Sequence, residues 1–428
     1  MELSRRRLVQ LGLLGMAGAS VGGLTAACGD SGSGSGDDSS LSLWIWGGGL
    51  STAVLDDAVK KFTKPKLKTQ EIGGDFKAKL LTTMTGGRGV PDITGVKGED
   101  IASFYPQAKQ FTDLNSLGAD KLKSQYLDWK WAQATAPDGT QIGIPIDIGP
   151  TALFYREDVF AEAGLPTDPA ELAAAASTYD DYFALGVQLK AKLPDHYLVK
   201  DLGTIFGMVT GAGTEFYVDK DDKFIGDEDH IRAAWDTAIK AITLEIDAKV
   251  TDGNDTNAGM TNGTLPAQLG AAWAGLDIAN GAPDSSGKWK VAANPGGPAN
   301  IGGSFLTIPK SSKNAEEAFE VITWILSPEN EARGFGDAAL FPATPSSYTM
   351  EELTKPDPFF GGQKTIEVFG PQAENIPVAY TSPYDGAVSA AYYEELGNIE
   401  AKGKDPEDAW DDAVSKAKSV AERLGVSV

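Results

Sequence analysis

Residues 137–160, with the sequence PDGTQIGIPIDIGPTALFYREDVF, constrain the fold more than any other stretch of the chain. Pro137-Asp138-Gly139 indicates a turn. The four isoleucines at every second position of Ile142–Ile148 predict a strand with one buried face. Gly149-Pro150 then interrupts the pattern, and the apolar run Ala152–Tyr155 predicts a second strand.

The interruption at Gly149-Pro150 leaves two interpretations open. Proline lacks an N–H group, so a central strand cannot run straight through Pro150. The segment also has no Asn-Gly or Gly-Gly pair that would fold the two strands into a tight hairpin. Either one bent strand lies within a single domain, or the chain leaves one sheet here and enters another. In the second case Asp147 lies beside a crossing between two lobes.

The N-terminus has the features of an export signal. Arg5, Arg6 and Arg7 form a twin-arginine pattern, and the uncharged stretch Leu8–Ala27 follows. Small residues precede Cys28, and a Gly/Ser-rich run follows it. This order resembles a bacterial lipoprotein signal, although Thr25 stands where that signal usually has leucine. An uncleaved membrane anchor and plain secretion are the alternatives.

The lipoprotein resemblance implies a twin-arginine signal peptide at 1–27 and a flexible linker at 28–40. It also implies that the protein crosses the membrane already folded and that Cys28 carries the lipid, including palmitate. Cys28 is the only cysteine of the chain. An intramolecular disulfide, a cysteine metal cluster and a redox pair are therefore excluded.

Composition limits the partners of the exported part. Without Glu2 and the three arginines, the 37 basic and 60 acidic residues fall to 34 and 59, a net charge of −25 for residues 28–428. Such a charge disfavours nucleic acids and anionic lipid surfaces as partners. The roughly 390 remaining residues exceed the usual size of a single core, which predicts two domains.

A glycine loop follows the first predicted strand. Leu41–Trp46 predicts the strand, Gly47–Gly49 the loop, and Ser51 the cap of a helix. A dinucleotide fingerprint would need a third glycine where Thr52 stands, so that function is excluded. What remains is a loop where backbone can approach a ligand closely. Trp46 beside it is either a ligand contact or a core residue.

Several other segments give weaker predictions. Asp252–Gly263 is predicted to be a polar loop, and the region of Trp129 and Trp131 to be surface helix and loop. Asn314 is predicted to cap a helix with Glu317 in the capping-box position. The acidic segment 219–230 does not fit a calcium-binding loop, because Phe224 stands where that loop needs glycine.

The order of these elements resembles the extracellular solute-binding proteins of bacterial ABC importers, in the carbohydrate-binding family that includes maltose-binding protein. The matching pieces are LSLWIWGGG, VPDITG, DGTQIGIPIDIGPTALFYREDVFAEAGLP, the AAW of LGAAW, GGSFLTIPKSSKNAEEAFEVITWILSPE, ALFPATP and NIPVAYTSPYD. The resemblance implies an α/β fold of type II, with two discontinuous lobes and a hinge. The N-terminal lobe would comprise 41–148 plus 302–343, and the C-terminal lobe 149–301 plus 344–428.

The resemblance also implies where a sugar binds. Sugars have apolar C–H faces that favour flat aromatic partners, and hydroxyls that favour carboxylates, amides and backbone groups. By position in the matching motifs, the ligand-binding residues are Trp46, Gly48, Glu99, Asp147, Trp273, Ser304, Phe341, Tyr380 and Tyr384. Asp147 lies two residues before the family's hinge carboxylate, where this chain has Gly149. Ordinary core packing is the alternative for each aromatic residue.

The function implied is capture of a sugar, expected to be a short oligosaccharide, and its delivery to the membrane permease of an ABC importer. The chain would be a monomer without cofactor or metal, held by its N-terminal lipid at the outer face of the cell membrane. A separate subunit would supply ATP hydrolysis, since no phosphate-binding loop occurs here. The alternative is a secreted carbohydrate-active enzyme with a carboxylate pair. No motif isolates such a pair, and His196 and His230 show no pattern of a catalytic triad or metal site.

Overall fold

The computed structural model describes residues 40–428. The predicted signal peptide, Cys28 and the linker up to residue 39 lie outside the described residues. Within 40–428, no helix has the length and apolar character needed to cross a membrane.

The first lobe is built on a five-stranded sheet with the strand order β2-β1-β3-β8-β4. Its strands are β1 (Ser40–Ile45), β2 (Lys66–Glu71), β3 (Ile93–Lys97), β4 (Ile144–Asp147) and β8 (Ser304–Thr307). β1 pairs in parallel with β2 and β3, whereas β8 runs antiparallel to both β3 and β4. The edge position of β4 explains how it accommodates Pro145, which has no N–H to donate.

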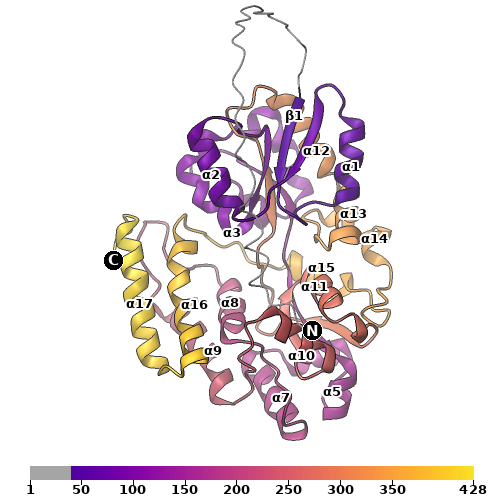
Figure 1. Cartoon of the computed structure of the whole chain (residues 1–428), viewed down its shortest axis with the longest axis vertical. Coiled ribbons are helices and arrows are strands. Elements are labelled where there is room, and N and C mark those ends of the chain that lie inside the picture. The colour runs from indigo at the N-terminus through magenta and orange to yellow at the C-terminus, as the bar shows by residue number, and fades with distance from the viewer. Residues whose placement is uncertain (1–39) are drawn as a thin grey trace, which may run out of the picture. The chain divides into compact units, whose positions relative to one another are not determined.

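Helices cover both faces of this sheet. Alternate residues of β1 point to opposite faces, so Leu41, Leu43 and Ile45 pack with helix α1, while Trp44 and Trp46 pack toward helix α2. Figure 1 shows β1 between these two helices. The helices of this lobe are α1 (Thr52–Lys61), α2 (Phe76–Gly86), α3 (Gly98–Ile101), α4 (Asp128–Gln133), α12 (Ala315–Ile325) and α13 (Pro328–Ala338), with several 3₁₀ turns between Ala102 and Gln125.

The segment 137–160 is a crossing between two sheets, as the second of the two interpretations predicts. β4 belongs to the five-stranded sheet, and β5 (Thr151–Arg156) is the central strand of a separate three-stranded sheet. At the crossing, the Gly149 N–H donates to Asn300 Oδ1 at 2.9 Å, and the Ile301 N–H donates to Gly149 O at 3.0 Å. Residues 294–303 lead from the three-stranded sheet back to the five-stranded sheet and form a second crossing. The two crossing segments therefore lie side by side.

The second lobe contains the sheet β6-β5-β7, in which both neighbours run antiparallel to β5. β6 spans Ala267–Ala271 and β7 spans Trp289–Ala293. The helices of this lobe and of the C-terminal part are α5 (Glu157–Ala163), α6 (Pro169–Ala175), α7 (Tyr179–Lys192), α8 (Leu202–Gly211), α9 (Asp229–Thr243), α10 (Gly253–Asn262), α11 (Ala274–Gly281), α14 (Glu351–Thr354), α15 (Ile366–Glu374), α16 (Asp385–Lys402) and α17 (Pro406–Arg423).

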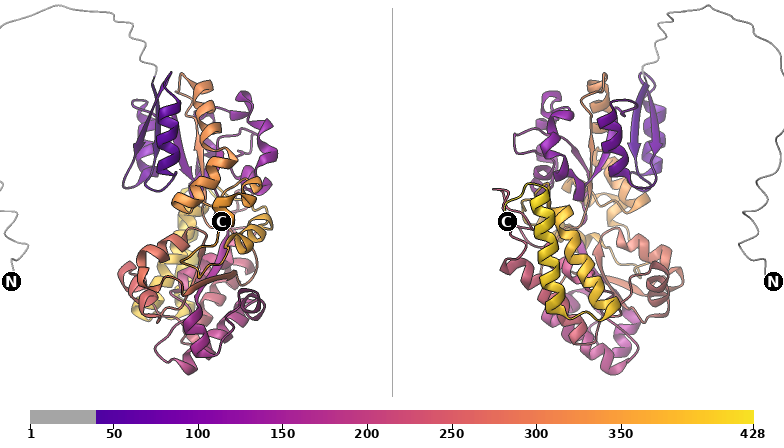
Figure 2. Two further views of the ribbon diagram at one scale, coloured as in Figure 1. Left: turned by 90° about the vertical axis from the view of Figure 1, so that its right-hand side faces the viewer. Right: turned by 60° about the vertical axis from the view of Figure 1, so that its left-hand side comes forward.

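The last two helices, α16 and α17, lie side by side along the second lobe (Figure 2). The buried Glu395 of α16 holds them together: it accepts from Lys404 Nζ at 2.6 Å and also pairs with Lys416 of α17. Two cations around one buried carboxylate compensate for its loss of hydration.

Two of the weaker predictions are wrong, and a third is confirmed only in part. Residues 253–262 form helix α10 instead of a loop, because Asp252 caps the helix by accepting from two backbone N–H groups. Trp129 and Trp131 are buried rather than at the surface, and the Trp129 indole donates to Ala373 O at 3.0 Å. The helix α12 does begin after Asn314, but its side chain makes no capping hydrogen bond.

Candidate ligand-binding cleft

The two crossings and the strand ends enclose a cavity of about 890 Å³, including the space at its mouth. We call it the central cavity. This volume is typical of small-molecule sites. Both lobes contribute to its walls. It is lined by Trp46, Gly47, Gly48, Gly49, Lys97, Glu99, Asp147, Trp273, Leu276, Asp277, Gly302, Gly303, Ser304, Ala338 and Leu340.

The outer part of the first-lobe wall consists of strand ends and glycine backbone. Gly48 has φ +77° and no atom within 4 Å of the position of a Cβ, so the loop after β1 is open to an approaching ligand. The Trp46 ring packs edge-on against Phe76 with centroids 5.2 Å apart, and Lys97 Nζ lies 5.5 Å from the Trp46 ring centroid. Trp46 is therefore partly a packing residue and partly a wall of the cavity. Glu99 is exposed, 3.9 Å from Lys97 Nζ.

The floor of the cavity holds a buried acceptor. Asp147, at the end of β4, and Ser304, at the start of β8, are each nearly inaccessible to solvent. The Ser304 hydroxyl donates to Asp147 Oδ1. Because the two strands are antiparallel neighbours, their ends meet at one place, and this places both side chains in the same hydrogen bond.

A lysine lies directly beneath this floor. Lys130 of α4 is fully buried, and its ammonium donates to Gln133 Oε1 at 3.1 Å and to Gly302 O at 3.4 Å. It also lies 4.1 Å from the Phe305 ring centroid. A Cβ at Gly303 would lie 2.6 Å from the ammonium and 2.6 Å from Asp147 O, so only glycine fits between the two charged residues.

Burial and the attraction between Asp147 and Lys130 have opposite effects on the pKa of each residue. Burial favours the neutral forms, and the attraction favours the charged forms. Burial raises the pKa of Asp147 to about 6, against the opposing effects of the Lys130 charge and the Ser304 hydrogen bond. Burial lowers the pKa of Lys130 to about 8, while the charges of Asp147 and Glu99 oppose that change. Both groups are thus charged between about pH 6 and pH 8, which leaves Asp147 a carboxylate able to accept hydrogen bonds.

The second-lobe wall is an aromatic platform. Trp273 precedes the first turn of α11, and its ring packs over the glycines of both crossings. A Cβ at Gly149 would lie 2.4 Å from the Trp273 ring and 1.8 Å from Ile301 O. The absence of a side chain at position 149 therefore makes room for this ring, and Asp147, two residues earlier, supplies a carboxylate to the cavity.

Six of the nine predicted ligand-binding residues line this one cavity: Trp46, Gly48, Glu99, Asp147, Trp273 and Ser304. Phe341 does not. It is fully buried, its ring contacts those of Phe335, Tyr348 and Phe369, and its backbone bridges Ile148. The prediction of Phe341 as a ligand contact is wrong in this geometry, because the ring completes the core behind the hinge.

Tyr380 and Tyr384 also lie outside the central cavity. Both belong to the loop that precedes α16, and Tyr384 is the residue directly before that helix. The Tyr380 N–H donates to Thr214 O at 3.1 Å, and the half-buried Tyr384 ring packs against the second-lobe core. Their predicted role as aromatic platforms stays a prediction.

The sequence reasoning missed Lys130, Leu276 and Asp277. Leu276 and Asp277 follow Trp273 by three and four residues, the spacing that places side chains on the same face of a helix. This spacing after a predicted cleft tryptophan is the signal that could have identified them. Burial raises the pKa of Asp277. Lys130 lies on a short helix between buried tryptophans, and no local pattern marks a lysine as fully buried.

The cavity thus combines an aromatic face, carboxylates and glycine backbone. In residues 40–428, no three His, Cys, Asp or Glu side chains are grouped in a way that could hold a metal ion. The lining groups can stack an apolar ring face and bind hydroxyls, which is the chemistry needed to hold a neutral polyhydroxylated ligand.

Comparisons with known proteins identify the family of this chain. Residues 48–332 match the bacterial extracellular solute-binding protein family. A lactose-binding protein of Rhizobium radiobacter is 24% identical over 379 residues, which cover 82% of this chain and 86% of that protein. An arabinooligosaccharide-binding protein of Bacillus subtilis is 24% identical over 289 residues, covering 63% of this chain and 64% of that protein.

Solved structures share the fold. A family 1 extracellular solute-binding protein is 30% identical, with a TM-score of 0.82 over 89% of this chain and 99% of its own. The galacto-N-biose/lacto-N-biose I-binding protein of a Bifidobacterium longum ABC transporter, solved with lacto-N-biose, is 22% identical, with a TM-score of 0.75 over 92% of this chain and 99% of its own. The fold is therefore the predicted two-lobe type II fold. Members of the matched family are binding proteins that work outside the cytoplasm, and this chain belongs to the bacterial extracellular solute-binding proteins.

Proposed function

We propose that this protein captures a sugar between its two lobes and delivers it to the membrane permease of an ABC importer. The observation that carries this proposal is the central cavity, in which the Trp273 ring of one lobe and the carboxylates of Asp147 and Glu99 of the other line the same space. The ring offers a flat apolar surface to a pyranose, and the carboxylates accept from its hydroxyls.

The related proteins support the same ligand class. Those named above bind lactose, arabinooligosaccharides and lacto-N-biose by their printed names, which are all short oligosaccharides. The proposed role is binding and not catalysis. The proposed lobes are 41–148 plus 302–343 and 149–301 plus 344–428, consistent with the two crossings between the sheets.

The test is a thermal-shift panel of oligosaccharides with the purified protein, followed by chromatography of the recovered sugar. Binding to the folded state must raise the melting temperature with increasing ligand concentration. We expect one sugar class to raise it saturably and to be recovered intact. Shortened products would instead support the carbohydrate-active enzyme. No shift with any sugar would contradict the proposal.

We also propose that the chain is a monomeric lipoprotein, exported by the twin-arginine route and anchored outside the cell membrane through Cys28. The support is the sequence around Arg5–Arg7 and the small residues before the cysteine. Replacing Cys28 with alanine should release the protein from the membrane fraction into the medium. Unchanged membrane association of that variant would contradict the lipid anchor.

A further inference from the structure

A buried ammonium lies where both crossings meet the first lobe. Lys130 belongs to α4, and its side chain is fully buried. Its ammonium donates to Gly302 O at 3.4 Å, at the first-lobe end of the second crossing. Asp147 is the last residue of β4, just before the first crossing, and a Cβ at Gly303 would lie 2.6 Å from both Asp147 O and Lys130 Nζ. Lys130 and Asp147 therefore lie close together at one end of the two crossings.

The surroundings of Lys130 keep its ammonium charged at neutral pH. Burial lowers the pKa of Lys130 to about 8, so the proton is still bound at pH 7. Besides Gly302 O, the ammonium donates to Gln133 Oε1 at 3.1 Å and lies 4.1 Å from the Phe305 ring centroid. Neutral oxygens and an aromatic face attract a cation without taking its proton. A positive charge is thus held beneath the floor of the central cavity.

Lys130 acts on Asp147 across a short distance and not through a direct ion pair. The side-chain donor to Asp147 Oδ1 is Ser304, and within residues 40–428 the ammonium hydrogen-bonds only to neutral oxygens. Burial raises the pKa of Asp147, and of the effects that oppose burial the Lys130 charge is the largest, ahead of the Ser304 hydrogen bond. Charges in a protein interior interact beyond contact distance because little water screens them.

The other charged groups around Asp147 do not replace this effect. Glu99 raises the pKa of Asp147, since both are carboxylates. Glu331 of α13 is buried, and burial raises its own pKa well above the usual range. Lys97 is half-buried beside Glu99, and Asp277 is exposed, so water screens both. Among residues 40–428, the fully buried cation that faces Asp147 is Lys130.

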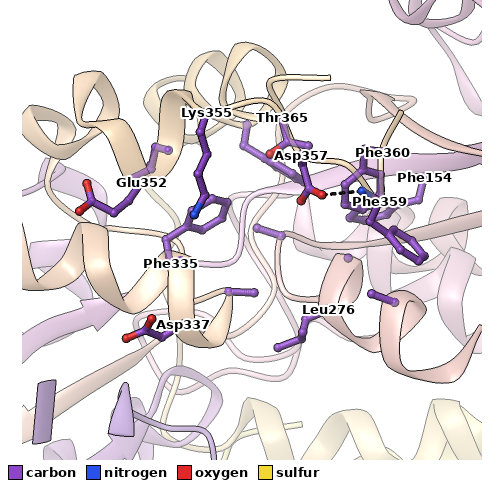
Figure 3. Close-up of a pocket in the computed structure, with 17 residues that line it drawn as sticks. Phe154, Leu276, Phe335, Asp337, Glu352, Lys355, Asp357, Phe359, Phe360 and Thr365 are labelled. Atoms are coloured by element: carbon purple, nitrogen blue, oxygen red, sulfur yellow. Dashed lines mark hydrogen bonds between the residues drawn. The ribbon is translucent and has the colours of Figure 1, made fainter. Parts of the chain in front are cut away.

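The charged residues of a neighbouring cavity are not part of this group. That cavity has a volume of about 850 Å³, including the space at its mouth, and shares only Leu276 with the central cavity. Neither Asp147 nor Lys130 lines it. Figure 3 shows its charged residues, which are Asp337, Glu352, Lys355 and Asp357.

We propose that Lys130 is a positioning residue of the sugar site, whose buried ammonium keeps Asp147 a carboxylate and therefore an acceptor for sugar hydroxyls at neutral pH. Lys130 does not line the central cavity, so it acts on the sugar through Asp147. This inference rests on the proposed function, because Asp147 belongs to the proposed sugar site. The effect of Lys130 on Asp147 is nevertheless measurable without a sugar.

The first test is thermal unfolding of the sugar-free protein between about pH 5 and pH 9. The native pKa of Asp147 lies above the unfolded value near 4, so the stability that this residue contributes falls as the pH rises and levels off near pH 6. Without the lysine charge, the native pKa should rise by about one unit or more. In Lys130→Met, compared with Lys130→Met/Asp147→Asn, the fall should therefore continue to about pH 7 or above.

The second test is calorimetric titration with the oligosaccharide that gives the largest thermal shift in the panel. At pH 7, Lys130→Met should weaken its binding by about twofold to tenfold, because a large part of Asp147 is then protonated. The loss should become smaller toward pH 9, as Asp147 ionises in the variant as well. Lys123→Met removes an exposed lysine outside the cavity, and this matched control should bind like the unsubstituted protein at both pH values.

A double-mutant cycle distinguishes positioning from a general structural role. If Lys130 acts through Asp147, adding Lys130→Met to Asp147→Asn should change sugar affinity by less than about twofold. The double variant carries neither buried charge, so it leaves no unpaired charge in the interior. Comparison of the double variant with Asp147→Asn therefore keeps the test valid even if Lys130→Met alone does not fold.

The outcomes separate this inference from the proposed function. If Lys130→Met leaves the pH dependence of unfolding unchanged, or weakens sugar binding equally at pH 7 and pH 9, this inference is overturned and the proposed function stands. Much weaker binding by the double variant than by Asp147→Asn also overturns it, because Lys130 then acts by another route. If the unsubstituted protein binds no sugar, the proposed function is overturned, and the positioning role with it.

Discussion

The two walls of the central cavity differ in chemistry. The first-lobe wall consists of strand ends, glycine backbone and polar groups, with Asp147 and Ser304 at its floor. The second-lobe wall is the Trp273 ring followed by the first turn of α11. The difference indicates that each lobe offers mainly one kind of contact, since Trp46 is the aromatic ring that the first lobe adds to the lining and Asp277 is the carboxylate that the second lobe adds. A ligand that needs both must hold the two lobes together, which is how ligand binding favours a closed arrangement.

The largest expected effect is on the platform. Trp273→Ala removes the main apolar surface facing the ligand and should weaken sugar binding by about 30-fold or more, the range of a dominant interface tryptophan. Trp44→Ala is the matched control, since Trp44 is also half-exposed but does not line the cavity. Calorimetric titration measures both. Equal sugar affinities of Trp273→Ala and the unsubstituted protein would show that the second-lobe wall does not contribute to binding.

The polar floor should contribute somewhat less. Asp147→Asn keeps the shape but removes the charged acceptor, and we expect about a tenfold loss of sugar affinity, since hydrogen bonds to a charged group are worth about 1.5–3 kcal/mol. The substitution also removes the counter-charge of the buried Lys130, so the unfolding temperature should be checked alongside. A folded variant with full affinity would show that the ligand does not contact the floor.

The pH dependence of sugar affinity is a second test of the role of Asp147. Because Asp147 has a raised pKa of about 6, the carboxylate is lost as the pH falls through 6, and sugar affinity should drop by several-fold between pH 7 and pH 5. Its effect on stability has the opposite sign. A native pKa above the unfolded value near 4 means that this group contributes stability at low pH and loses it as the pH rises toward 6.

Calorimetry and thermal unfolding over pH 5–7.5 therefore separate the two effects of Asp147. The Asp147→Asn protein should lose the component of the pH dependence that has its midpoint near 6. An unchanged pH profile in that variant would assign the titration to another group.

Glu99 should contribute less than Asp147 because it is exposed and competes with water. We expect Glu99→Gln to weaken binding by about threefold, in line with the small net energies of exposed charged groups. Calorimetric titration tests this, and a loss as large as that of Asp147→Asn would mean that Glu99 becomes buried when the ligand binds.

The smallest effect is expected at Tyr384. Its ring packs against the second-lobe core outside the central cavity, so Tyr384→Ala should change sugar affinity by less than about twofold, measured by the same titration. The start of α16 nevertheless faces the first lobe, since a Cβ at Gly386 would lie 3.9 Å from Glu99 O. A much larger loss would place Tyr384 at the site in the closed arrangement, as the sequence resemblance predicts.

The end of the strand at Gly149-Pro150 was predictable because its signals are local, whereas the crossing between the sheets remained one of two interpretations. Four alternating isoleucines specify a strand, and Gly149-Pro150 ends it, so the residues themselves exclude a continuous central ladder. The proximity of Asp147 and Trp273 required the family resemblance, because residues more than a hundred positions apart meet only in the folded chain. The family's hinge carboxylate is replaced here by Gly149, and only the folded chain shows why, because the Trp273 ring fills the space that a side chain at position 149 would need.

The unpredicted features depend on tertiary contacts. The burial of Lys130 needs the Gly302 carbonyl, the Phe305 ring and Asp147, which come from other strands. Phe341 belongs to an aromatic core with Phe335, Tyr348 and Phe369, and its position in the matching motifs alone placed it in the cleft. Helix α10 was mistaken for a loop because its residues are polar, whereas its Asp252 cap favours the helix.

The most direct measurement is a crystal structure of the protein with the sugar that gives the largest thermal shift. We expect electron density for a pyranose ring against the Trp273 indole, with a hydroxyl in hydrogen-bond distance of Asp147 or Ser304. A sugar bound on one lobe alone, or at a place that touches neither Trp273 nor Asp147, would contradict the conclusion that the ligand lies between the two walls.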